Sequence, residues 1–239
     1  MNIFKALIAY FFQYYKRSNR YVVPLFVYII IISGTYTASQ QEPMDSYIFT
    51  CIYTYLISSW LAFSFIDSED EVQEQLTIIR IKNQNIYYLC KILFVWFIVI
   101  ILSILTVLYP ILINSFTKKP SLIYIIIMII NHSLIGLLGI TVSVNFNSRL
   151  IKDRKMAILY LNVVIIISLI EKALSQCIPF LKYIIKVFPP VYLIINSISK
   201  IHFISIQNIF QITCNLLIVL VYSLILIFIF IKLMKKNMF

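Results

Sequence analysis

The 239 residues are 62% hydrophobic and only 12% charged, with a mean hydropathy of +0.95. A soluble domain carries roughly 45–50% apolar and about 25% charged residues, so this composition excludes a protein whose whole surface faces water. The formal net charge is +11, but Lys and Arg gather at the ends of apolar runs rather than along one face. This placement argues against nucleic acid as a partner and indicates a membrane surface.

The first expected element is an amphipathic helix over residues 2–17. Its apolar side chains recur at spacings of one, three and four, namely Ile3, Phe4, Leu7, Ile8, Phe11, Phe12 and Tyr15. We expect this helix to lie in the cytoplasmic interface, close to anionic lipid headgroups. The alternative is that it forms the first turns of a longer spanning helix, but Lys16, Arg17 and Arg20 interrupt that run. No small-residue cleavage site follows, so we expect the N-terminus to be retained.

Six long apolar runs follow and predict an all-α membrane protein with six transmembrane helices in one domain, 1–239. The runs lie at about 21–39, 47–66, 92–115, 121–144, 156–175 and 211–231. A helix needs about 20 apolar residues to cross a hydrocarbon core of ~30 Å, and each run meets this length. A transmembrane barrel would instead show alternating segments of about ten residues.

The positive charges predict the orientation. With both termini inside, the cytoplasmic side holds 14 of the 20 Lys and Arg residues, which are Lys5, Lys16, Arg17, Arg20, Arg80, Lys82, Lys91, Arg149, Lys152, Arg154, Lys155, Lys232, Lys235 and Lys236. The positive-inside rule therefore predicts a multi-pass protein of a bacterial cell membrane with both termini in the cytoplasm.

The connection 67–91 is expected to contain a short cytoplasmic helix. It begins with five acidic residues, and Ser68 with Glu71 three positions later matches a capping box. Val72, Leu76 and Ile79 share one face, and we expect this face to pack against the protein's own helices.

The outer connection, about 177–200, contains Pro179, Pro189 and Pro190. Proline interrupts helices, and the apolar stretches between these prolines are too short to span a bilayer. The segment is expected to form re-entrant or interfacial half-helices before the last span.

The sequence contains no recognisable catalytic or cofactor-binding motif. Its three glycines cannot form a phosphate-binding Gly-rich loop, and its two histidines, His132 and His202, cannot form a two-histidine metal motif on one helix. We therefore expect a non-enzymatic subunit without a metal or a cofactor of its own.

Two segments resemble ABC-2 type transporter permeases. The stretch SEDEVQEQLTIIRIKNQNIYYLCKIL (68–93) is similar to the acidic start, coupling helix and Tyr-Leu-Leu-Gly-Lys-like beginning of the third span in that family. Val72 and Ile81 stand where the family has Gly and Pro. The stretch FPPVYLIINSISK (188–200) resembles the family's Asn-Pro-Leu-plus-aromatic pattern in the re-entrant region.

The resemblance covers the whole chain and implies a permease whose ATPase, with its ATP and Mg²⁺, is a separate polypeptide docking on the 68–83 loop. The coupling residues that it implies are Glu71, Glu74, Gln75, Ile78, Ile79 and Arg80. By analogy with the family's architecture, Tyr53, Trp60 and Asn162 are candidates for the translocation path. The further partners implied are membrane lipids, a second copy or a related permease, and an amphipathic peptide as substrate.

The chain is rich in Ile, Lys and Asn and has small outer loops. In these features it resembles Gram-positive exporters of phenol-soluble modulins and transporters of bacteriocin immunity. Two alternatives remain open at this stage. One is a stand-alone membrane carrier or peptide-immunity protein, and the other is an ABC exporter of lipids or drugs. A carrier needs no cytoplasmic docking helix, so the 68–83 loop favours the ABC exporter.

Overall fold

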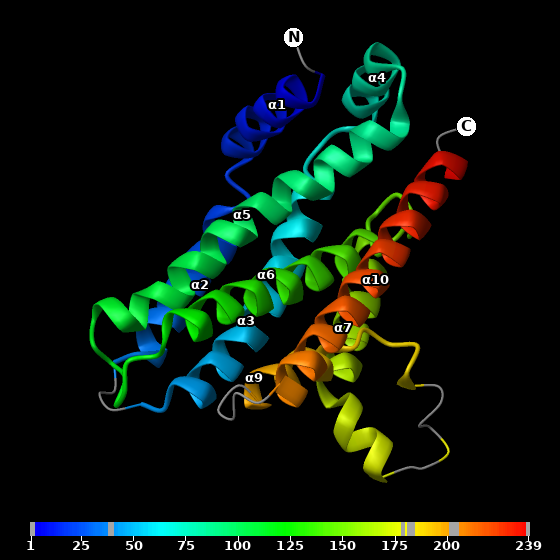
Figure 1. Cartoon of the computed structure of the whole chain (residues 1–239). Coiled ribbons are helices and arrows are strands. Elements are labelled where there is room, and N and C mark those ends of the chain that lie inside the picture. Colours follow the sequence, from blue (N-terminus) through cyan, green and yellow to red (C-terminus); the bar gives the residue numbers. More distant parts are fainter. Residues whose placement is uncertain (1–2, 38–40, 178–179, 181–184, 201–205, 238–239) are drawn as a thin grey trace.

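The computed structural model describes residues 3–37, 41–177, 180, 185–200 and 206–237, and the regular structure in these ranges is helical. The helices are α1 (Ile3–Ser18), α2 (Val22–Thr35), α3 (Pro43–Ile66), α4 (Glu71–Ile81), α5 (Gln84–Leu112), α6 (Leu122–Val144), α7 (Arg154–Cys177), α9 (Val191–Lys200) and α10 (Ile206–Asn237). Figure 1 shows α1, α4 and both ends of the chain at one end of the bundle, and α9 towards the other.

Among the described helices, five are long and apolar enough to cross a membrane: α3, α5, α6, α7 and most of α10. The all-helical, multi-pass class predicted from the sequence is therefore confirmed. The first predicted span, 21–39, differs from expectation, because α2 has only 14 residues and extends about 21 Å at 1.5 Å per residue. It joins α1 at a bend of 83°, so the two helices count as a sixth span only if this bent pair is one span.

The centre of the bundle is the pair α3 and α6, which approach closely at Gly139. A Cβ atom placed there would lie 2.7 Å from the carbonyl oxygen of Tyr55 and would also overlap the Ser58 hydroxyl. Polar side chains connect the same helices, since Thr50 Oγ1 lies 3.0 Å from His132 Nε2. The absent side chain of glycine thus permits helix contact at backbone distance, as in other membrane bundles.

The helix α5 begins eight residues earlier than the predicted span at 92–115. Lys82 ends α4 in the left-handed conformation, with φ 59°, and Asn83 caps α5 by accepting a hydrogen bond from the Ile86 amide. The helix therefore includes Tyr87 and Lys91. The length of the apolar run left both in the connection 67–91, because a charge normally ends such a run, whereas the resemblance placed them at the beginning of the third span. Here the Lys91 ammonium is buried among partners, so the helix continues through it.

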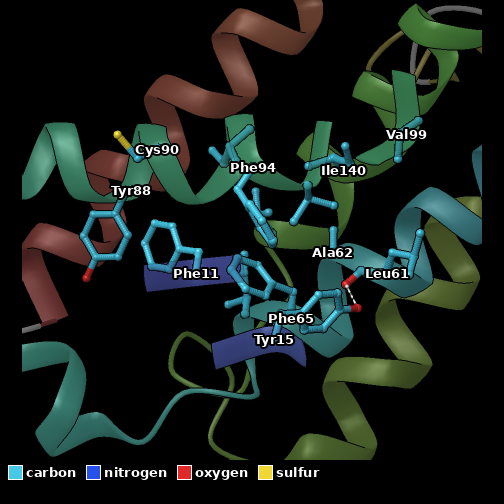
Figure 2. Packing of buried hydrophobic residues seen from close by; sticks show 14 of the residues in the cluster. Phe11, Tyr15, Leu61, Ala62, Phe65, Tyr88, Cys90, Phe94, Val99 and Ile140 are labelled. Carbon is cyan, nitrogen blue, oxygen red and sulfur yellow. Dashed lines mark hydrogen bonds between the residues drawn. The ribbon is translucent and has the colours of Figure 1, made fainter. Parts of the chain in front are cut away.

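The predicted N-terminal amphipathic helix forms α1, but only part of its apolar stripe is buried in the bundle, and the rest is exposed. Leu7, Phe11 and Tyr15 are buried, and Figure 2 shows the rings of Phe11 and Tyr15 against Phe65 of α3 and Phe94 of α5. Other members of the stripe face outward, and these are Ile3, Phe4 and Phe12. One side of α1 thus joins the bundle core, while the other is left for an apolar environment.

At the opposite end, α9 is a ten-residue helix that begins directly after Pro189 and Pro190. Its buried residues Val191 and Ile194 pack into the core formed with α3, α6 and α10. This agrees with the half-helix predicted between 177 and 200, although Pro179 lies outside the described residues. In the most apolar 18-residue stretch of each helix, only 22% of α7 and 17% of α10 is buried. Most of the surface of these two helices therefore faces outward.

Candidate coupling site at the α4 end of the bundle

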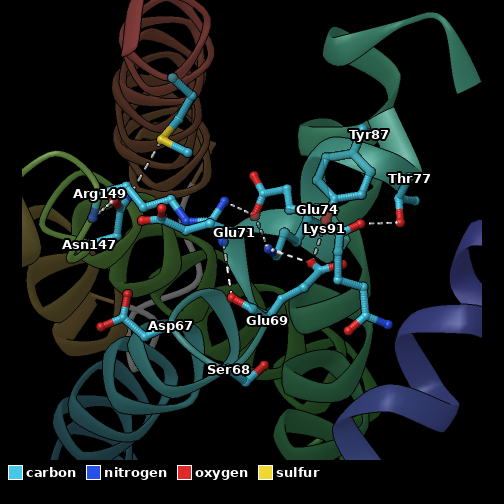
Figure 3. A network of polar contacts seen from close by, with 12 residues as sticks. Asp67, Ser68, Glu69, Glu71, Glu74, Thr77, Tyr87, Lys91, Asn147 and Arg149 are labelled. Atoms are coloured by element: carbon cyan, nitrogen blue, oxygen red, sulfur yellow. Dashed lines mark hydrogen bonds and ion pairs between the residues drawn. The ribbon is translucent and has the colours of Figure 1, made fainter. Parts of the chain in front are cut away.

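Four charged side chains meet beneath α4, in the interior of the protein. Lys91 Nζ on α5 lies 2.9 Å from Glu69 Oε2 and 3.3 Å from Glu74 Oε2, and Arg149 pairs with the same Glu74 oxygen. The Lys91, Glu69 and Glu74 side chains are at most 2% exposed. Two cations balance two carboxylates, which is the condition under which buried charges are tolerated. We call these four residues the buried ion cluster (Figure 3).

Tyrosine hydroxyls extend the buried ion cluster to α1. Tyr10 donates a 2.7 Å hydrogen bond to Glu69 Oε1, and Tyr87 donates to Glu69 Oε2. Tyr14, one turn after Tyr10, donates to the Ser68 carbonyl at 2.7 Å. The polar side of α1 is thereby held to the segment that leads into α4.

The pKa of Glu69 is set by two opposing effects. Burial raises it, but the Lys91 charge, assisted by the hydrogen bonds from Tyr87, Lys91 and Tyr10, lowers the pKa below its ordinary value. A lowered folded-state pKa means that Glu69 contributes stability above the pKa of an unfolded glutamate, about 4.3. This contribution is constant near neutral pH and is lost as the pH falls through the lowered folded-state value.

A second set of contacts ties the end of α3 to the connection between α6 and α7. Asp67 Oδ1 accepts hydrogen bonds from the Ser148 amide at 3.1 Å and from its hydroxyl at 2.9 Å. Arg149 also donates to the Glu69 carbonyl at 3.0 Å, and Arg20 donates to the Asp67 carbonyl at 2.7 Å. The segment 67–70 is therefore anchored from both the N-terminal and the α6–α7 sides.

The structure reverses the expected orientation of α4. Glu74 and Ile78 are buried, whereas the apolar residues expected to face inward, Val72, Leu76 and Ile79, are 64%, 62% and 70% exposed. The physical reason is the buried ion cluster, because Glu74 reaches cations on α5 and after α6 that stabilise its charge inside. Because residues four positions apart lie on the same face of a helix, Glu74 and Ile78 face inward together and the apolar stripe on the other face points outward.

The beginning of α4 also differs from the predicted capping box. Asp70 is the N-cap, and its side chain accepts a hydrogen bond from the Glu71 amide at 3.0 Å. The Ser68 hydroxyl instead donates to the Phe65 carbonyl at 2.6 Å. Ser68 therefore completes the last turn of α3 and does not start α4.

Of the six residues predicted to contact an ATPase, four lie on the exposed side of α4, and they are Glu71, Gln75, Ile79 and Arg80. Beside them, α1 and α4 enclose a groove of about 550 Å³. Its lining includes Ala6 and Tyr10 from α1 and Gln73, Leu76 and Arg80 from α4. Glu74 and Ile78 are separated from this surface by their burial.

The three candidates for a translocation path do not form one site. Trp60 of α3 and Asn162 of α7 line the same groove of about 380 Å³, together with Phe63 and with Arg154 at one end. Tyr53 is not among the described lining residues, and its ring packs on Phe49, with ring centroids 4.6 Å apart. The groove is thus mixed in character, with aromatic, hydroxyl, amide and cationic side chains.

Sequence reasoning missed Lys91, Arg149 and Tyr87 as members of a site. Lys91 and Arg149 were counted as positive charges flanking spans, and the resemblance placed Tyr87 and Lys91 at the beginning of the third span. Nothing in local spacing links residues 17 to 80 positions apart. One signal was present, since five acidic residues within 67–74 in a chain with nine acids in all need compensating charge nearby.

In the part of the chain that the structure describes, no three His, Cys, Asp or Glu side chains gather as a metal site would require. Comparison of the chain with protein-family models, with curated proteins and with solved structures finds no match.

Proposed function

We propose that the chain is the membrane-spanning subunit of an ATP-driven ABC exporter, and that α4 is the helix on which a separate ATPase subunit docks. The observation that carries the proposal is the inverted orientation of α4. The exposed row of Val72, Leu76 and Ile79 at one end of a membrane protein supports the proposal, because it leaves apolar surface for a partner subunit to cover. The membrane would not cover it if α4 lies in the cytoplasm, as the distribution of Lys and Arg predicts.

The buried ion cluster supports this proposal by giving α4 a firm link to the spans. Glu74 connects α4 to Lys91 on α5 and to Arg149 after α6, while Glu69 connects the same region to Tyr10 on α1. Charged hydrogen bonds in a dry interior hold their geometry, so a displacement of α4 would move several helices together. A helix that only capped the bundle would not need such connections.

The proposed transport unit contains two permease subunits, identical or related, because one bundle of this size supplies half of a pathway. The sparsely buried helices α7 and α10 offer surface for lipid and for a second permease. The groove at Trp60 and Asn162 fits an amphipathic peptide, since it presents aromatic walls beside polar groups.

Co-purification tests the docking. Leu76→Asp places a charge in the exposed apolar row and should remove the ATPase from the purified complex without lowering the amount of folded permease. Leu122→Asp is the matched control, because Leu122 is 78% exposed at the first position of α6, on the other side of the bundle. ATPase recovery at the level of the control in the Leu76→Asp variant would contradict docking on α4, whereas the absence of an ATPase from the purified wild-type protein would favour a stand-alone carrier or immunity protein.

A further inference from the structure

The bend between α1 and α2 encloses a groove that is separate from the ATPase and translocation surfaces. Its volume is about 300 Å³, at the lower end of the roughly 300–1,000 Å³ usual for small-molecule sites. The walls are apolar and aromatic, from Phe12 and Tyr15 of α1, Leu25 of α2 and Ile98 of α5. Tyr21 lies at the bend itself, and Tyr15 and Phe94 of the same lining are seen in Figure 2.

The single charged residue described in the lining is Lys16, and it belongs to a basic cluster. Lys16 and Arg17 form the last turn of α1, and Arg20 follows at the bend. In the described residues, no carboxylate forms an ion pair with Lys16 or Arg17, and both side chains are exposed. Lys16 in the lining of the groove, and Arg17 next to it in the sequence, thus carry positive charge without a counterion in the described part of the chain.

The position of the groove matches the boundary between hydrocarbon and water. The helix α2 is apolar and runs along α3, while α1 departs from it at 83°, as a helix lying in the interface would. Exposed Phe12 and half-buried Tyr21 at this level suit the acyl and headgroup regions, where aromatic side chains are enriched. Basic pockets between membrane helices are recognition sites for anionic headgroups.

We propose that this groove at the bend between α1 and α2 binds one anionic phospholipid of the membrane. An acyl chain lies along Phe12, Leu25 and Ile98, and the phosphate is held by Lys16 and Arg17. The shape of the groove selects the chain, and the two cations select the headgroup. This inference is independent of the proposed transport function, because it needs only that α1 lies at the membrane surface.

Native mass spectrometry of the purified full chain tests the proposal, with phosphatidylglycerol and phosphatidylcholine of identical acyl chains as probes. The wild-type protein should bind phosphatidylglycerol more tightly. The Lys16→Gln/Arg17→Gln variant should lose about fivefold in phosphatidylglycerol affinity for each cation removed, while phosphatidylcholine binding stays unchanged. The control Lys118→Gln/Lys119→Gln, which removes two exposed lysines between α5 and α6, should leave both affinities as they are.

A second variant, Leu25→Trp, fills the groove and should weaken the binding of both lipids. Equal wild-type affinity for the two lipids, or an unchanged preference in Lys16→Gln/Arg17→Gln, would overturn the proposal. So would an equal loss in the lysine control, because it would indicate diffuse charge attraction, or full lipid retention in Leu25→Trp.

Discussion

The ammonium of Lys91 lies 2.9 Å from the carboxylate of Glu69, and both side chains are almost wholly buried although they are 22 residues apart. The same ammonium faces Glu74, so one residue of α5 fixes both the segment before α4 and α4 itself. The position of α4 thus depends on a charge inside the protein as well as on the apolar packing of Ile78.

Removing that charge should be strongly destabilising. Lys91→Met keeps a long side chain but leaves Glu69 without its cation, and loss of one partner of a buried ion pair costs about 3–5 kcal/mol. Thermal unfolding in detergent should therefore shift to clearly lower temperature than in Lys82→Met, an exposed control on the neighbouring turn. Equal stability of the two variants would show that the buried ion cluster does not hold this end of the bundle.

Two acidic residues three positions apart should respond differently to charge reversal. Glu71→Lys changes an exposed side chain and should leave the amount of folded protein unchanged. Glu74→Lys would bury a cation beside Lys91 and Arg149 and should lower the yield of folded protein sharply. Size-exclusion elution of the two variants checks this, and similar monodisperse yields would contradict the burial of Glu74.

These two residues also show what the sequence could and could not predict. Five of the six predicted spans follow from the length of apolar runs, and the existence of a helix near 71–81 follows from its period. Its orientation does not, because amphipathic patterning assumes that charges face water. Glu74 faces inward because Lys91 and Arg149, 17 and 75 positions later, lie beside it, and local periodicity contains no information on such pairs. The same applies to the first residues of α5, which a buried Lys91 makes part of the helix.

The close contact of α3 and α6 predicts a contrast between two glycines. Gly139→Ala would place a methyl group 2.7 Å from the Tyr55 carbonyl oxygen and should destabilise the protein by about 1–3 kcal/mol. Gly34→Ala, with no atom within 4 Å of the new Cβ, should be neutral or stabilising by up to about 1 kcal/mol, because alanine is the better helix former. Thermal unfolding of both variants measures the contrast, and a Gly139→Ala protein as stable as wild type would rule out backbone-distance packing.

The groove between α3 and α7 predicts different effects for the three candidate path residues. Trp60→Ala and Asn162→Ala remove groove walls and should reduce the survival of cells exposed to an amphipathic membrane-active peptide. Tyr53→Ala, outside the described lining, should have the smaller effect. Membrane levels of all three variants serve as the control, and a stronger effect of Tyr53→Ala would place the substrate path elsewhere.

If α4 transmits ATP hydrolysis to the spans, as we propose, a substitution on its exposed face should change the hydrolysis rate measured in proteoliposomes. The ATPase would be the subunit that co-purifies with the wild-type permease, reconstituted with wild-type permease, with Ile79→Asp or with Leu122→Asp. We predict that wild-type permease and Leu122→Asp stimulate ATP hydrolysis, and that Ile79→Asp, with its changed residue on the exposed face of α4, does not. Equal stimulation by Ile79→Asp and wild type, or no stimulation by any of the three, would contradict the coupling role of α4.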